Sequence, residues 1–370
     1  MRTRALVIAT MVIAATGCGG SADGSSAVGQ VAPSAAIASS PDGVAVASAT
    51  PSASPTPLCD DRPPPPFVTH ASHPNDGVPD PAGRIVFGMS DHDDPILGQI
   101  VEPLLGIDPD GSDLALVLNC QVERPRISHD GTRLAFSIVM DDGTWQVATS
   151  AIDGSDLRLL TSTTGWAEWP DWGPDDSWLS FTLTDRCEPW PACTSLESSH
   201  NVIWRVNADG SDPRPIGDPS GHDHEPRLSP DGREVVFDRH IFDPAHPTGV
   251  ALTIRDLATG EERRVFSTDY DPEHLDWSPD GKWIIYNMPG YEGPEVIGRM
   301  PADDPNATPE MLYGDEDHPG IKPAYSPDGS RIVFGCSRML CLMDADGSNV
   351  VTLVQLQEEP FNHFAWGVAP

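Results

Sequence analysis

The segment Pro226-Arg-Leu-Ser-Pro-Asp-Gly-Arg-Glu-Val-Val-Phe237 carries a pattern that the chain repeats four more times. In each copy an apolar residue and a Ser or Gly precede a tight turn of the Asp-Gly type, and an alternating apolar run follows. The other copies are residues 125–136, 170–181, 275–286 and 323–334. Their turn aspartates, Asp130, Asp175, Asp231, Asp280 and Asp328, are spaced 45, 56, 49 and 48 residues apart. A period of this length indicates an architecture of stacked or radial repeats.

Each copy is followed by a second tight turn, at residues 152–156, 208–212, 258–260 and 345–348. Gly supplies the positive φ that such hairpin turns need. Four short strands in units of about 48 residues are typical of a β-propeller. Residues 83–112 supply the later strands of a sixth unit, and residues 363–367 supply its first strand. We therefore predict an all-β, six-bladed propeller over residues 83–370, closed by strands from both ends of the chain, which removes exposed sheet edges.

The first 18 residues have the layout of an export signal. Arg2 and Arg4 precede an apolar stretch, residues 5–14, that is too short to span a bilayer. Residues Ala15-Thr-Gly-Cys18 resemble a bacterial lipobox, which implies that Cys18 is lipid-modified and that the mature chain is anchored to the bacterial membrane, facing the periplasm or the exterior. An ordinary signal peptide cut nearby is the alternative.

Residues 19–82 form a segment of different composition. They are rich in Ser, Ala, Pro and Gly, with four consecutive prolines at 63–66. Such a composition buries too little apolar surface to offset the entropy of ordering, and prolines favour extended geometry. We expect a disordered tether that holds the propeller away from the membrane.

The charge of the chain limits its partners. It has 56 Asp and Glu against 22 Lys and Arg, a formal net charge of −34. This excess repels phosphate backbones and anionic lipid headgroups, so nucleic acid is not an expected partner and membrane contact is expected only through the lipid anchor. The chain has no other long apolar run, which argues against a polytopic membrane protein. We expect a monomer.

Six cysteines remain besides Cys18, and an even number in an exported chain indicates disulfides. Cys187 with Cys193, and Cys336 with Cys341, are spaced to close short loops. Cys59 and Cys120 are left, and their pairing would pin the tether to the propeller. A metal site is the alternative, but the chain has no C-x-x-C pair.

The Ser-Pro-Asp-Gly turns followed by Asp-Gly-Ser turns resemble the Pro-Asp propeller repeats of TolB-like periplasmic proteins and of prolyl-oligopeptidase-like peptidases. The resemblance covers about 288 of 370 residues. It implies a binding or scaffolding module of the cell envelope, although a few related propellers are lyases. The chain has no evident N-terminal α/β domain, so the partners of TolB itself are not transferred to it.

The first strand of each blade is expected to line a central channel, with alternate residues pointing the same way. We call the repeated pattern the template. The residues just before its Ser or Gly should pack between blades: Ile127, Trp172, Leu228, Trp277, Tyr325 and Trp366. The position before these, which we call the inner row, should line the channel with charges of alternating sign: Arg126, Asp171, Arg227 and Asp276, followed by Ala324 and Ala365. These charges either neutralise one another and hold register or take part in binding.

A second set of channel residues, two positions further back, forms what we call the outer row. It contains Arg124, Trp169, Glu225, His274, Lys322 and His363. We predict that the outer row, at the channel mouth, binds a small polar ligand or a peptide terminus. His224, Glu225, His274 and His363 carry donors suited to a divalent metal, but no close helical spacing supports such a site. We expect neither a metal nor a cofactor.

The tight turns should share one face of the ring, so the longer connections should lie on the other. These variable loops are residues 90–99, 184–201, 238–249 and 288–295. Variable loops on a rigid scaffold are the usual place for recognition, and we expect an envelope protein, peptide or glycan there. Trp166, Trp169 and Trp190 would stack on such a ligand or, alternatively, serve only as packing.

The predicted function is non-catalytic binding or scaffolding in the cell envelope. A peptidase of the resembling family would need a hydrolase domain with G-x-S-x-G, and the chain contains no such sequence. The alternative is a channel-based lyase or hydrolase acting on carbohydrate or peptide. For that chemistry Glu225 and His274 are the acid–base candidates.

Overall fold

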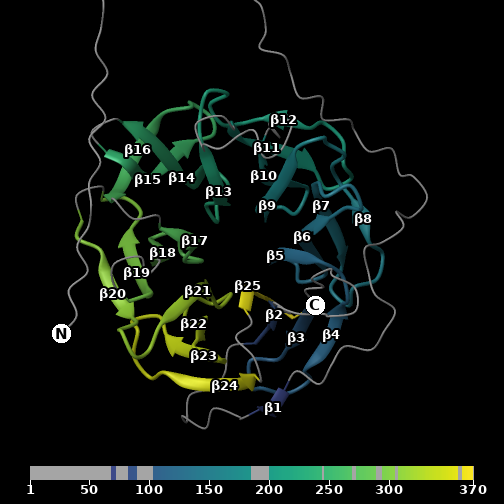
Figure 1. The fold of residues 1–370 in the computed structure, drawn as a ribbon, viewed down its shortest axis with the longest axis vertical. Coiled ribbons are helices and arrows are strands. Elements are labelled where there is room, and N and C mark those ends of the chain that lie inside the picture. The colour runs from purple at the N-terminus through teal and green to yellow at the C-terminus, as the bar shows by residue number, and fades with distance from the viewer. Residues whose placement is uncertain are drawn as a thin grey trace, which may run out of the picture. The chain divides into compact units, whose positions relative to one another are not determined.

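The computed structural model describes residues 68–71, 82–89, 103–184, 200–243, 246–268, 272–288, 294–304, 307–356 and 361–369. These residues form six antiparallel sheets arranged as blades around a central axis (Figure 1), which confirms the six-bladed propeller. They contain no helix, and thus none long and apolar enough to cross a membrane. The signal segment with Cys18, most of the tether, and Cys59, Cys187, Cys193 and Trp190 lie outside the described residues.

The blades are numbered in chain order, and each is given from the axis outward. Blade 1 is β25 (Phe361–Gly367), β2 (Arg84–Met89), β3 (Leu104–Ile107) and β4 (Ala115–Leu118). Blade 2 is β5 (Val122–Ile127), β6 (Arg133–Val139), β7 (Trp145–Ala151) and β8 (Arg158–Leu159). Blade 3 is β9 (Trp166–Trp172), β10 (Trp178–Thr184), β11 (Asn201–Asn207) and β12 (Arg214–Pro215).

The other three blades follow the same order. Blade 4 is β13 (Asp223–Leu228), β14 (Glu234–Asp243), β15 (His246–Asp256) and β16 (Glu262–Thr268). Blade 5 is β17 (Glu273–Trp277), β18 (Trp283–Met288), β19 (Val296–Pro301) and β20 (Glu310–Tyr313). Blade 6 is β21 (Gly320–Tyr325), β22 (Arg331–Cys336), β23 (Met339–Asp344) and β24 (Val351–Leu356).

Strands from both ends of the chain close the ring, as predicted. In blade 1 the C-terminal strand β25 pairs antiparallel with β2, and Ile85 lies opposite Trp366. Blade 6 has an additional outer strand, β1 (Val68–Ala71), which pairs with β24. β1 lies within residues 19–82, whose composition predicts a disordered tether, so part of that segment pairs with the propeller.

The Asp-Gly-type turns of the repeated pattern explain why blades 2 to 6 each begin with a hairpin. In blade 2 the Asp130 carboxylate accepts hydrogen bonds from the Ser128 hydroxyl and the Thr132 amide, at 2.8 and 2.9 Å. Gly131 follows with a φ of 75°, which favours glycine. Blade 3 has Asp176 at this position, with a φ of 56°, and its carboxylate accepts the Asp130 amide of the neighbouring blade.

The core consists of apolar layers between neighbouring blades. Each of six clusters of buried side chains joins two adjacent sheets. The aromatic residue that ends the template is at most 1% exposed in every blade: Phe87, Phe136, Phe181, Phe237, Tyr286 and Phe334. Trp172, Trp277 and Trp366 pack between blades as predicted. The blades are therefore held by lateral packing, which fixes the position of the strands at the axis.

One predicted disulfide lies within the described residues. Cys336 and Cys341 are bonded across the β22–β23 hairpin. Cys120 is also disulfide-bonded, and its partner lies outside the described residues.

Candidate functional site

The first strand of each blade carries the predicted channel residues, and each of these strands contains an irregularity in its pairing. In five blades a non-glycine residue of the outer row has a positive φ, between 51° and 59°: Arg124, Trp169, Glu225, His274 and Lys322. This is a β-bulge, in which one extra residue re-aims the side chain. The two rows are predicted from an uninterrupted alternation of side chains along each strand. The bulge interrupts this alternation between the outer row and the inner row.

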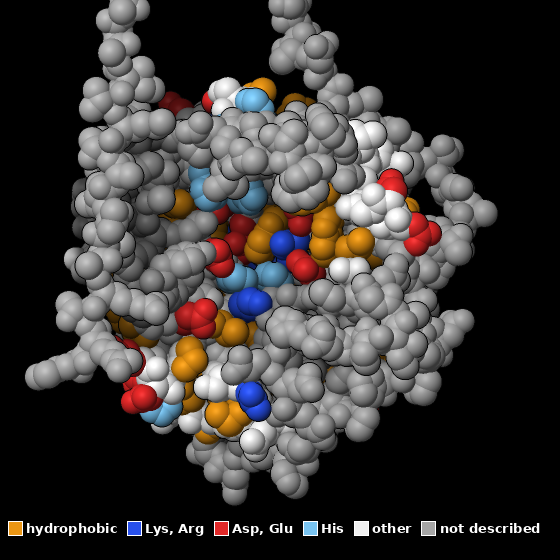
Figure 2. Space-filling view, viewed as in Figure 1, with side chains coloured by type: hydrophobic (Ala, Val, Ile, Leu, Met, Phe, Trp, Pro, Cys, Tyr) orange, Lys and Arg blue, Asp and Glu red, His pale blue; other side chains and the backbone are white. Residues whose placement is uncertain are grey.

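Four side chains of the outer row converge at the axis. Trp169 stacks under the Arg124 guanidinium, 4.2 Å from the ring centroid. His363 meets Trp169 edge-on at 5.0 Å and lies against His274 at 4.7 Å between ring centroids. Figure 2 shows histidine and basic side chains gathered near the centre of this face. The structure therefore brings most of the outer row together, and the proposed ligand contact remains a prediction.

The two axial histidines are neutral at neutral pH. Burial lowers the pKa of His363 well below its ordinary value, and the neighbouring His274 and Lys322 lower it further. Burial likewise lowers the pKa of His274, with Lys322 and Arg124 contributing. Neither ring nitrogen of His363 has a hydrogen-bond partner among the described residues.

Glu225 is buried, and its hydrogen bonds join blade 4 to blade 5. Its carboxylate accepts the backbone amides of His274 and Leu275, at 2.7 and 2.8 Å, and the Arg227 guanidinium at 3.2 Å. Burial raises the pKa of Glu225 to about 7, against the opposing effects of Arg227 and the His274 amide. Burial also lowers the pKa of Arg227 to about 10. Glu225 contacts the His274 main chain, so its hydrogen bonds are structural contacts between blades.

His224 contacts a different set of side chains from Glu225, His274 and His363, the other residues considered as metal ligands. It packs edge-on against His240 and contacts the Asn201 side-chain amide. Burial, with the neighbouring His240, lowers the pKa of His224 to about 3. In the part of the chain that the structure describes, no three His, Cys, Asp or Glu side chains are grouped as metal ligands.

The inner row cross-links the blades at the axis. Asp171 of blade 3 accepts the Leu228 amide of blade 4 at 2.7 Å, and Asp276 of blade 5 accepts the Tyr325 amide of blade 6 at 2.9 Å. The Trp172 and Trp277 indoles donate to main-chain carbonyls of the preceding blades, at 3.3 and 3.0 Å. These side chains therefore hold the channel strands in a fixed arrangement.

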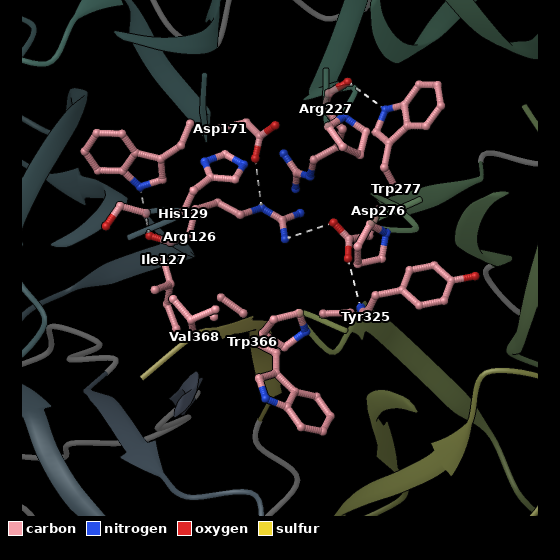
Figure 3. A pocket seen from close by; sticks show the side chains of 18 of the residues that line it. Arg126, Ile127, His129, Asp171, Arg227, Asp276, Trp277, Tyr325, Trp366 and Val368 are labelled. Carbon is pink, nitrogen blue, oxygen red and sulfur yellow. Dashed lines mark hydrogen bonds and ion pairs between the residues drawn. The ribbon is translucent and has the colours of Figure 1, made fainter. Parts of the chain in front are cut away.

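Arg126 crosses the channel. From blade 2 it donates to the Leu275 carbonyl of blade 5 at 3.2 Å, the same carbonyl that Arg227 reaches at 2.9 Å. Its guanidinium lies 3.6 Å from Asp171 and 3.5 Å from Asp276 (Figure 3). The inner-row charges are thus brought together.

A cavity of 310 Å³ lies at this level of the channel. The inner row lines it together with Ser128, His129, Pro230, Pro279, Ser326 and Pro327 from the template turns. The cavity therefore belongs to the tight-turn face. The sequence predicts a ligand site on the opposite face, whose variable loops fall largely outside the described residues. The feature of the sequence that could have indicated this cavity is the pair Ala324 and Ala365, where small side chains take the place of the charged ones in the inner row.

No family model matches the chain. An uncharacterized protein of Agrobacterium fabrum is 29% identical over 168 residues, covering 43% of this chain and 52% of that protein. The uncharacterized peptidase YuxL of Bacillus subtilis is 25% identical over 203 residues, covering 55% of this chain and 27% of that protein. The chain thus spans about half or less of the length of these curated relatives.

Solved structures share the propeller. The crystal structure of TolB from Acinetobacter baumannii superimposes with a TM-score of 0.61 at 18% identity, over 79% of this chain and 68% of that one. Hydrazine synthase of Kuenenia stuttgartiensis gives a TM-score of 0.63 at 16% identity, over 77% of this chain and 47% of that one. At such identities the likeness is one of fold alone, that of the β-propeller.

Proposed function

We propose that this chain is an exported, lipid-anchored protein of the bacterial cell envelope whose propeller binds a ligand without catalysis. The observation that carries the binding function is the 310 Å³ cavity at the axis, walled by strands that hydrogen bonds between blades hold in place. Concave sites of this size with a few placed polar groups are typical of ligand binding. The arrangement favours a preformed site.

Export and anchoring are supported by Arg2, Arg4, the apolar segment and the lipobox-like residues ending at Cys18. The TolB-like fold of the solved neighbours is consistent with this location. Labelling cells with a radioactive fatty acid tests the anchor. The full chain should incorporate label and sediment with membranes, and Cys18→Ser should do neither. Label retained in Cys18→Ser would remove the anchor from the proposal.

Binding is favoured over the enzyme alternative because both Glu225 carboxylate oxygens accept main-chain amides of blade 5. A general acid must reach a substrate atom, and this carboxylate is already used in joining two blades.

The binding function is tested with a dialysed extract of the cell envelope. Small molecules from the extract should raise the melting temperature of the full chain. They should not raise that of Ala365→Leu, whose longer side chain fills the cavity. Shifts of equal size in both proteins, or in neither, would contradict a role for the cavity. Chemical cross-linking of the same extract tests the second expected class of partner, an envelope protein held by the variable-loop face.

A further inference from the structure

The Arg126 guanidinium has hydrogen-bonding capacity that the protein does not use. An arginine carries five N–H donors. Arg126 makes one side-chain hydrogen bond within the described residues, from Nη2 to the Leu275 carbonyl. Its approaches to Asp171 and Asp276, at 3.6 and 3.5 Å, are longer than charge-assisted hydrogen bonds. Arg126 therefore presents donors to the cavity that it lines.

The two flanking carboxylates present matching acceptors. In Asp171 and in Asp276, Oδ2 accepts a backbone amide of the next blade. The Oδ1 atoms face the guanidinium without a donor at hydrogen-bonding distance among the described residues. Figure 3 shows Arg126 between these two carboxylates at the edge of the cavity. The polar wall thus offers one group of donors between two acceptors.

Another part of the cavity lining is largely apolar. Ala324 and Ala365 occupy the inner row in the two blades without a charged residue there, and they line the cavity with Ile127, Tyr325 and Val368. At about 30 Å³ for each water molecule, 310 Å³ holds on the order of ten heavy atoms. A small ligand with one aliphatic branch fits this space.

The charges of the inner row favour a ligand with no net charge. Arg126 and Arg227 balance Asp171 and Asp276, so the charged groups at this level sum to zero. A ligand of single charge would leave one ion without compensation in a partly desolvated site, which is unfavourable. A ligand that carries both signs avoids this penalty.

We propose that the cavity binds a free, zwitterionic α-amino acid with an aliphatic side chain, an assignment that rests on the proposed binding function. The carboxylate of the ligand accepts from Arg126, its ammonium donates to Oδ1 of Asp276, and its side chain packs on Ala324 and Ala365.

Isothermal titration calorimetry of the full chain tests this with three probes: L-leucine, N-acetyl-L-leucine and L-leucinamide. L-leucine should bind with a dissociation constant below about 1 mM, as expected of a ligand with on the order of ten heavy atoms. Each blocked compound, which lacks one of the two charges, should bind about tenfold or more weakly. Absence of leucine binding, or binding of N-acetyl-L-leucine as tight as that of leucine, would overturn the assignment.

Asp276→Asn is the sharpest variant, because an amide oxygen can keep the hydrogen bond to Tyr325 while the charge is lost. It should weaken leucine binding about tenfold or more. Arg126→Gln should do the same, and Ala365→Leu should abolish binding. Asp317→Asn, at an exposed position outside the cavity, is the matched control and should bind as the parent does. Parent-like binding by Asp276→Asn and Ala365→Leu would contradict the site.

The extract experiment separates this assignment from the proposed function. If leucine fails to bind but the extract still stabilises the parent and not Ala365→Leu, the amino-acid assignment is wrong and the cavity remains a binding site. If the extract also has no selective effect, both are wrong.

Discussion

Glu225→Gln tests whether a buried carboxyl at the axis makes the propeller less stable as the pH rises. Glu225 is 1% exposed, and burial raises its pKa from 4.5 to about 7. In the unfolded chain the same carboxyl titrates near its ordinary value. Between pH 4.5 and 7 the native state therefore binds more protons than the unfolded state, and stability falls as the pH increases.

The size of the effect follows from the two pKa values. At roughly 1.4 kcal/mol per pH unit, the difference between 4.5 and about 7 corresponds to about 3 kcal/mol. This contribution is fully present below pH 4.5 and is lost as the pH rises through about 7. Glutamine does not ionise, and its carbonyl oxygen still accepts one of the amides of His274 and Leu275.

Urea unfolding of the parent and of Glu225→Gln at several pH values between 4 and 8 measures the effect. The free energy of unfolding of the variant minus that of the parent should increase by about 3 kcal/mol across this range. Glu316→Gln, at an exposed position, is the control and should give a nearly constant difference. A difference for Glu225→Gln that varies by less than about 1 kcal/mol would refute the reasoning, because the carboxyl would then titrate alike in both states.

Two matched pairs of substitutions test the turns and the contacts between blades. A Cβ at Gly131 would lie 2.4 Å from the Val368 carbonyl, whereas one at Gly143 meets nothing within 4 Å, and both residues have positive φ. Gly131→Ala should therefore lower the free energy of unfolding more than Gly143→Ala does. The latter should cost only about 1 kcal/mol, from backbone strain. Equal losses in urea unfolding would show that the Val368 carbonyl moves away from the new Cβ at little cost. The Trp277 indole donates to the neighbouring blade, while that of Trp366 has no partner among the described residues. Trp277→Phe should thus cost about 1 kcal/mol more than Trp366→Phe in thermal unfolding, and the reverse order would contradict a role for the indole hydrogen bond.

The blades were predictable because their signals are local. A Ser-Pro-Asp-Gly turn closes its own hydrogen bonds, as the Ser128, Asp130 and Gly131 turn shows, so its sequence alone marks where a hairpin begins. The join between β2 and β25 was predictable for a different reason. Each end of the chain lacked the part of a blade that the other supplied.

The bulge in the channel strands was not predictable from residue type. Arg124, Trp169 and Lys322 share the same backbone conformation, yet none is a residue that favours positive φ. The conformation depends on how the strands meet at the axis, which is a property of the assembled ring. The sequence places the outer row in the channel. Because it does not reveal the bulge, it does not show that Trp169 and His363 pack together there.

The hydrogen bonds made by the Asp171 and Asp276 carboxylates make the strands at the axis harder to separate than the strands at the outer edge of the ring. Each bonds to an amide of the next blade, Leu228 or Tyr325, so exchange of either amide with solvent deuterium requires two sheets to separate. The outermost strands can fray one at a time while these two amides stay protected. Such a gradient would let the periphery fluctuate while the axial cavity keeps its shape.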